Sequence, residues 1–233
     1  FDEMAQDVVR RVGVSPRDLV VDIGSSVGTL LQAFRTHAGA RVIGVDASKN
    51  IAALARKNNI KTIEQFWGSN AARQILAVGR AKVITATNCF NHIADTDTFM
   101  KSVMRTLAQD GAFVIEVPYL LPLVEKCAFD TMYLEHVSYF AIKPLAKFFA
   151  RFGLAISDIQ ENDYMGGTIR VTVGKRKIKK ESVAAAYIAR EEAAGLFENR
   201  VYEEMEEKVR KFKSRLVKKI IGIQKKGGRL IGI

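Results

Sequence analysis

The chain has 233 residues, 48% of them hydrophobic, which is enough to bury one substantial core. We expect a globular, cytoplasmic protein, because no apolar run reaches the roughly 18 to 20 residues that span a bilayer and the first residues lack the basic start of a signal peptide. Two cysteines, Cys89 and Cys127, are too few for a disulfide framework or a zinc cluster. We therefore expect buried thiols and no bound metal.

The net charge of +11 is concentrated at the C-terminal end. Residues 1–174 hold 19 Lys+Arg and 17 Asp+Glu, a net of +2, so residues 175–233 carry the other +9. The basic residues there alternate with acidic ones and lack the interleaved aromatics of a base-stacking surface. We interpret them as a solvated helix face, with steering of an anionic substrate or nucleic-acid binding as less favoured alternatives.

Strand and helix patterns alternate through the first half of the chain. Short apolar runs predict buried strands, and apolar residues three or four apart predict helices. The expected strands are 19–23, 40–46, 61–66, 81–86 and 111–117, and the expected helices are 4–12, one opening at Leu30, 50–58, 71–78 and 98–107. This order predicts an α/β fold with a doubly wound, mostly parallel sheet and helices on both faces.

The second half of the chain departs from this alternation. After a helix over 143–152, two strand patterns at 155–160 and 168–173 predict an antiparallel edge joined across Gly166 and Gly167. Residues 181–224 are rich in helix patterns and include one long amphipathic helix. We expect a first domain over 1–174 and a basic helical extension over 175–233, which ends in a strand-like run from Gly228.

The segment from Leu19 to Phe34 reads as a strand, a glycine turn and a helix start, which is where a nucleotide-type ligand is expected. The dinucleotide fingerprint needs glycine at the first, third and sixth positions, and here only Gly24 fits, because the others are Ser26 and Thr29. The methyltransferase pattern, an acidic residue followed by alternate glycines, matches at three of its four positions: Asp22, Gly24 and Gly28. The spacing therefore favours S-adenosylmethionine (SAM) over NAD.

Two carboxylates could serve such a cofactor: Asp22 for its amino acid end and Asp46 for its ribose hydroxyls. Asp46 lies 22 residues after Gly24 and suits either cofactor. A turn that binds no nucleotide remains an alternative, because one glycine motif is weak. Phe66 and Trp67, after the third strand, either flank the adenine or belong to the core.

From Val21 to about Val173 the chain resembles the SAM-dependent sugar C-methyltransferases, which methylate ring carbons of nucleotide-linked 4-keto deoxysugars. The segments that carry the resemblance are 22–25, 88–93, 111–121, 129–133, 135–140 and 166–170. The most specific is the Glu-His-x-Ser-Tyr-Phe run that begins at Glu135. The family also has an N-terminal zinc-binding domain and a C-terminal nucleotide-fold domain, so we expect either the core of a longer protein or a reduced relative.

The resemblance implies a chemistry for this run. Methylation next to a ketone needs a base for the C–H proton and a hydrogen-bond donor for the enolate oxygen. His136 is the implied base, oriented by Glu135 or a tyrosine, and Tyr133 and Tyr139 are the candidate donors. His92, after the fourth strand, is expected to face the same crevice. From the residues alone, the Glu-His pair could equally satisfy backbone groups, and the resemblance favours the catalytic interpretation.

The candidate catalytic residues are His136, Glu135, Tyr133, His92 and Tyr139. The candidate cofactor-binding residues are Asp22, Gly24, Ser25, Ser26, Gly28, Asp46, Ala47, Phe66, Trp67 and Asn88. The expected function is transfer of a methyl group from SAM to a keto deoxysugar, with the nucleotide sugar as the small-molecule partner. The alternatives are methylation of oxygen or nitrogen, and a non-catalytic module that assembles through the C-terminal helix.

Overall fold

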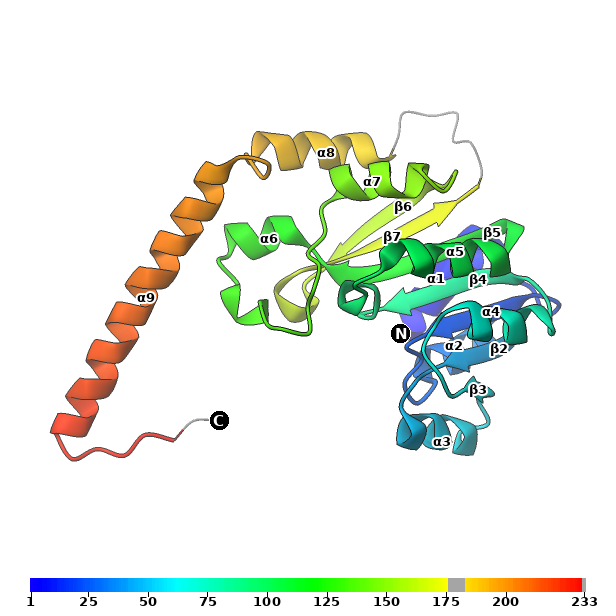
Figure 1. Ribbon diagram of the computed structural model, residues 1–233, viewed down its shortest axis with the longest axis horizontal. Helices are drawn as coiled ribbons and strands as arrows, with labels where there is room; N and C mark the ends of the chain where they lie inside the picture. The colour runs from blue at the N-terminus through cyan, green and yellow to red at the C-terminus, as the bar shows by residue number, and fades with distance from the viewer. Residues whose placement is uncertain (176–182, 232–233) are drawn as a thin grey trace.

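A computed structural model describes residues 1–175 and 183–231. Its centre is one seven-stranded sheet with the order β3-β2-β1-β4-β5-β7-β6 (Figure 1). The strands are β1 (Leu19–Ile23), β2 (Arg41–Val45), β3 (Thr62–Ile63), β4 (Ala81–Thr87), β5 (Leu107–Pro118), β6 (Ala155–Asn162) and β7 (Thr168–Gly174). The first five strands pair in parallel, while β7 runs antiparallel to both β5 and β6. The predicted mostly parallel sheet with an antiparallel edge is confirmed.

Helices pack on both faces of the sheet because successive strand residues point to opposite sides. Val20 belongs to an apolar cluster with residues of α1 and α2, whereas its neighbour Val21 belongs to a second cluster with residues of α4, α5 and α7. The helices are α1 (Asp2–Val12), α2 (Thr29–Ala38), α3 (Lys49–Lys57), α4 (Ser69–Leu76), α5 (Thr96–Thr106), α6 (Leu120–Glu125), α7 (Ile142–Ala150), α8 (Val183–Ala193) and α9 (Asn199–Lys225). None of them is long and apolar enough to cross a bilayer, as far as the described residues go.

The third strand is much shorter than the expected 61–66. Ile63 pairs with Val45, and β2 ends there, so no partner backbone remains for residues 64–66. Those residues instead form the loop that leads into α4. This shortening leaves Gln65, Phe66 and Trp67 outside the sheet, just after the carboxyl end of β3.

The C-terminal part forms two helices, and Figure 1 shows the long helix α9 leading away from the sheet. Residues 228–231, expected to start a strand, are not in a strand. Three stretches lie outside the described part of the chain: the basic residues of 176–180, the first two residues of the helix-rich segment (181–182), and residues 232–233.

The strand order reverses beside β1, because β2 lies on one side of it and β4 on the other. In an open parallel sheet the crevice at such a reversal, outside the carboxyl ends of the strands, is where ligands bind. The glycine loop follows β1 there. The segments that follow β4 and β5 begin at the same end of the sheet, because these strands are parallel to β1.

Candidate functional site

The glycine loop is held against the carboxyl end of β2. The N–H groups of Gly24 and Ser25 donate to the carbonyl of Val45 at 2.8 and 3.2 Å. The N–H of Ser26 donates to the carboxylate of Asp46 at 3.0 Å. Asp46 therefore lies directly beside the loop, where the sequence predicts a nucleoside.

Alternate residues of this loop adopt left-handed backbone conformations, with φ of 72° at Gly24, 49° at Ser26 and 86° at Gly28. This conformation favours glycine, so the backbone keeps the alternate-glycine pattern although its middle member is a serine. Gly28 has a packing reason as well, because a Cβ there would lie 2.6 Å from the Ile60 side chain.

Asp22 is buried, with 2% of its surface exposed, and its carboxylate accepts a hydrogen bond from the Thr85 hydroxyl at 2.6 Å. Burial raises the pKa of Asp22 to about 7, and the nearby Asp46 acts in the same direction, while the Thr85 hydrogen bond opposes the shift. A cationic ligand would favour the charged carboxylate. Asp22 is thus a buried acid beside the loop rather than an open rim residue.

The side chain of Cys89, two residues after β4, packs against the glycine loop. A Cβ at Gly24 would lie 3.1 Å from both the Cβ and the Sγ of Cys89. Burial raises the pKa of Cys89 to about 12, with smaller contributions from Asp22 and Asp46. Cys89 is therefore a neutral packing thiol at physiological pH.

Several buried polar atoms around this edge have no protein partner. They include Nε2 of Gln65, after β3, and Oδ1 of Asn88, after β4. A buried polar atom without a partner is costly, so these two atoms favour a polar ligand or an ordered water at the site. The Asn88 oxygen can accept from an amino or hydroxyl group, and the Gln65 NH₂ group can donate to a hydroxyl or carboxylate oxygen. Gln65 escapes sequence analysis because one glutamine after a weak strand forms no pattern.

The other candidate cofactor residues differ in how accessible they are. The Ser25 hydroxyl points toward the sheet, where it fills the space left by the missing side chain of Gly44. Trp67 packs inward and donates its Nε1–H to the Phe99 carbonyl at 3.2 Å. Phe66 is 86% exposed, so it is the aromatic side chain of the pair that is free to stack on an adenine, and Ala47 is also exposed.

His136 is held by two neighbours in the loop that follows β5. Its Nδ1 lies 3.1 Å from the carbonyl oxygen of Thr131, and its Nε2 lies 2.7 Å from the hydroxyl of Tyr133. Because a carbonyl only accepts, Nδ1 carries a proton. His136 is 6% exposed, and the lone pair of its neutral form lies at Nε2, which faces the Tyr133 hydroxyl.

His92 and Tyr139 lie beside this imidazole. The ring of His92 is 5.0 Å from that of His136 between centroids, and the ring of Tyr139 is 6.2 Å away. The Nδ1 of His92 lies 2.6 Å from the backbone carbonyl of Glu135. Glu135 is exposed and contributes that carbonyl, so the orientation of His136 falls to Thr131 and Tyr133, and only the tyrosine was among the expected candidates.

The glycine loop and the His136 cluster meet through the segment that follows β4. Cys89 packs on Gly24, and two residues later the carbonyl of Asn91 accepts a hydrogen bond from the N–H of Ser138 at 3.2 Å. The predicted cofactor loop and the predicted catalytic residues therefore share one edge of the sheet.

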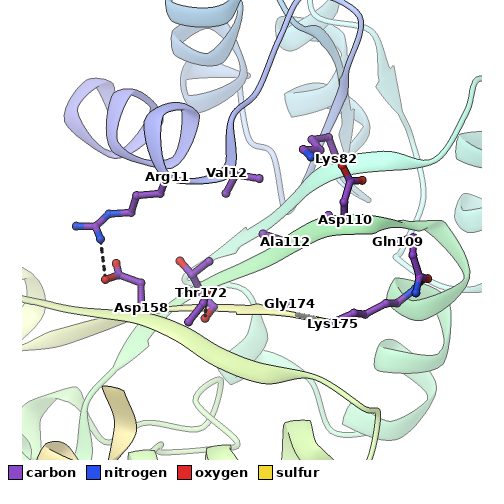
Figure 2. Close-up of a pocket in the computed structure, with 12 residues that line it drawn as sticks. Arg11, Val12, Lys82, Gln109, Asp110, Ala112, Asp158, Thr172, Gly174 and Lys175 are labelled. Carbon is purple, nitrogen blue, oxygen red and sulfur yellow. Dashed lines mark hydrogen bonds and ion pairs between the residues drawn. The ribbon is translucent and has the colours of Figure 1, made fainter. Parts of the chain in front are cut away.

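A cavity of about 420 Å³ lies away from this site, between α1 and the strands β4, β5, β6 and β7, at the end of the sheet where β4 begins (Figure 2). Four of its charged side chains form ion pairs, Arg11 with Asp158 at 2.9 Å and Lys82 with Asp110 at 2.5 Å, and the Lys175 ammonium donates to the Gln109 side chain at 3.3 Å. It contains none of the candidate site residues.

Family models match almost the whole chain. Residues 2–159 match the methyltransferase domain, and residues 163–233 match the C-methyltransferase C-terminal domain. A curated relative, C-methyltransferase NovU from Streptomyces niveus, is 33% identical over 227 residues. That match covers 96% of this chain and 54% of NovU, so the chain spans about half the length of this relative.

Solved structures share the fold at low sequence identity. The magnesium protoporphyrin IX methyltransferase ChlM from Synechocystis, with bound SAH, aligns over 75% of this chain and 83% of its own, with a TM-score of 0.58 and 13% identity. The cyclopropane synthase MmaA2 from Mycobacterium tuberculosis aligns over 73% and 82%, with a TM-score of 0.57 and 13% identity. These structures show the shared fold, and the family models with the 33% identical relative show that the chain belongs to the SAM-dependent methyltransferases and carries the C-terminal domain signature of the C-methyltransferases.

Proposed function

We propose that this chain provides the catalytic core for methyl transfer to a ring carbon next to the ketone of a nucleotide-activated keto deoxysugar, through an enolate. The observation that carries the proposal is the placement of His136, whose Nε2 lies 2.7 Å from the Tyr133 hydroxyl and whose ring lies beside those of His92 and Tyr139. This arrangement combines a base with donors for a developing oxyanion.

SAM, when bound, supplies an electrophilic methyl group on a sulfonium. Of the chain's residues, Asp46 and Asn88 would hold the nucleoside, Asp22 would face the cationic end and Phe66 would cover the adenine. Their placement around the glycine loop supports this assignment, as does the unpartnered Asn88 oxygen.

The base step exchanges one hydrogen bond for another. The Tyr133 hydroxyl turns from His136 to the ketone oxygen, and the freed Nε2 takes the proton from the adjacent carbon. The carbonyl of Thr131 keeps Nδ1–H in place and stabilises the imidazolium that results. Tyr133 is partly exposed, so its side chain has room for this rotation. The Tyr139 hydroxyl, which donates to the Thr131 carbonyl at 3.4 Å, turns to donate a second hydrogen bond to the enolate oxygen.

The choice of carbon as the methyl acceptor is supported by the C-methyltransferase signature and by the likeness to NovU. The keto sugar and its nucleotide are supported by the resemblance of the Glu135–Phe140 run to sugar C-methyltransferases. We also propose a division into a methyltransferase domain over 1–174 and an extension over 175–233.

The test uses purified protein, SAM and a thymidine diphosphate 4-keto deoxysugar. We expect a product with a new carbon-bound methyl group by NMR. In deuterated water without SAM, we also expect deuterium to enter the sugar at the carbon next to the ketone. A methyl group on oxygen or nitrogen would contradict the proposal, and absence of SAM binding by calorimetry would favour a non-catalytic module.

A further inference from the structure

Glu191 is a fully buried carboxylate, with 0% of its surface exposed, and it lies on α8 within the C-methyltransferase C-terminal domain match. Its Oε1 accepts hydrogen bonds from the Tyr119 hydroxyl at 3.1 Å and from the N–H of Ile142 at 2.5 Å. Its Oε2 accepts from the N–H of Lys143 at 3.0 Å. A charge this deeply buried is tolerated where hydrogen bonds satisfy it, and here three donors do so.

Two of these donors are the N-terminal N–H groups of α7. A helix leaves its first N–H groups without partners, and a side chain at the N-cap position usually accepts from one of them. The N-cap of α7 is Ala141, whose methyl group cannot accept. The third helical residue, Pro144, has no N–H, so the N–H groups of Ile142 and Lys143 are the ones that need a cap. Glu191 accepts from both.

The third donor, Tyr119, lies at the other end of the loop that carries His136. Tyr119 directly follows β5 and forms a bridge with Phe140, and the N–H of Leu120 donates to the Phe140 carbonyl at 2.8 Å. Glu191 thus contacts both the entry and the exit of the loop over 120–141. Burial and this carboxylate raise the pKa of Tyr119 well above its ordinary value, so the hydroxyl stays a donor.

Two neighbours of Glu191 on α8 form further contacts with β6, Tyr119 and α7. Arg190 forms a two-bond ion pair with Glu161 at 2.8 Å and lies over the Tyr119 ring. Glu192 pairs with the Lys143 ammonium at 2.6 Å, but both side chains are partly exposed. The contact through Glu191 is the buried one, so it is expected to dominate.

We propose that Glu191 is a positioning residue, which caps α7 from α8 and closes the base of the catalytic loop so that Tyr133, His136 and Tyr139 keep their arrangement. This inference rests on the proposed function for its effect on turnover, although the cap itself does not. It makes α8 a structural part of the active site although none of its residues reaches the reacting atoms.

The cap is tested first on the unmodified chain by amide hydrogen exchange. The first two N–H groups of an uncapped helix exchange at loop-like rates, whereas buried bonds to Glu191 predict slow exchange at Ile142 and Lys143. We expect protection of at least about a hundredfold at both amides. Exchange at unprotected rates would overturn the proposal, and this measurement does not depend on any enzymatic activity.

The positioning role is tested with Glu191→Gln, which keeps the size of the side chain but removes the charge and turns an NH₂ group toward the N–H of either Ile142 or Lys143. We expect kcat at saturating SAM and sugar to fall at least about tenfold, while SAM affinity changes less than about twofold, because the glycine loop is not touched. The matched control is Glu192→Gln, which loses the exposed pair with Lys143 and is expected to keep kcat within about twofold.

Ala141→Ser supplies a cap from the helix itself, since its hydroxyl can accept from the Lys143 N–H. Alone it should leave kcat unchanged. In the double variant with Glu191→Gln, kcat should be at least about threefold higher than in Glu191→Gln alone. Unchanged kcat in Glu191→Gln, an equal loss in Glu192→Gln, or no rescue would overturn the positioning role. If Glu191→Gln does not fold, the exchange measurement decides. If the unmodified chain shows no methyl transfer, the proposed function fails and the cap is still decided by exchange.

Discussion

His92 and His136 lie ring beside ring, with centroids 5.0 Å apart and planes inclined at 64°. His92 follows β4, and His136 lies in the loop after β5. The backbone carbonyl of Glu135 accepts a hydrogen bond from Nδ1 of His92. His136 is buried and His92 is exposed. The Nδ1 of each ring donates to a backbone carbonyl, so these hydrogen bonds fix the two segments and their rings relative to each other.

Replacing Tyr133 by Phe tests how His136 is oriented. The change removes the hydroxyl that donates to Nε2 at 2.7 Å and the proposed enolate donor, and keeps the ring. We expect kcat to fall by about tenfold to a hundredfold with SAM affinity unchanged. Tyr164→Phe, which alters an exposed tyrosine on another loop, is the control and should keep full activity. Equal activities of the two variants would contradict the account of Tyr133.

Asp22→Asn is expected to change two properties in opposite directions: it raises the stability of the fold at high pH and weakens SAM binding. The folded pKa of Asp22 is about 7 against an ordinary value of 3.8, so the folded state binds this proton more tightly than the unfolded state. Wild-type stability therefore falls as pH rises from about 4 to about 7, at roughly 1.4 kcal/mol per pKa unit. The asparagine cannot ionise and still accepts from Thr85.

We expect urea unfolding to show Asp22→Asn as the more stable protein at pH 8, with most of that gain absent at pH 4. SAM should bind the variant more weakly, because a carboxylate near its cationic end is lost. A stability difference that is the same at both pH values would show that Asp22 does not carry the raised pKa.

Gly24→Ala tests the contact between the glycine loop and Cys89, in the segment after β4. The left-handed conformation costs a non-glycine residue about 1 to 2 kcal/mol, and the added methyl group would lie 3.1 Å from Cys89. Gly153→Ala is the matched control, because its φ of 69° is similar and no atom lies near its Cβ position. We expect both variants to lose stability in thermal unfolding, and Gly24→Ala alone to lose SAM binding. Normal SAM affinity in Gly24→Ala would contradict the placement of the cofactor.

The sheet could be predicted because its strands have strong local patterns. The run from Leu19 to Ile23 is buried at every position, and β5 stops near Pro118 as expected. The length of β3 could not be predicted, since it depends on where β2 ends and leaves residues 64–66 without a partner.

The candidate site shows a similar division. The Glu135–Phe140 run marks residues whose rings lie beside His92, and the segment after β4 joins them to the glycine loop. The partners of those residues leave no sequence signal: the Thr131 carbonyl that fixes His136 is a backbone group, and Glu191 reaches α7 from a helix far along the chain. The roles assigned to the candidate residues, and the domain boundary at residue 174, stay predictions.

The most direct test of the central claim is hydrogen exchange into the keto sugar, measured in deuterated water with wild type and His136→Ala. The account predicts that wild type exchanges the proton next to the ketone without SAM and that His136→Ala loses this exchange by at least about a hundredfold. The variant should still bind SAM with wild-type affinity by calorimetry, because the glycine loop is unaltered. Undiminished exchange in His136→Ala, with SAM binding intact, would contradict the assignment of His136 as the base.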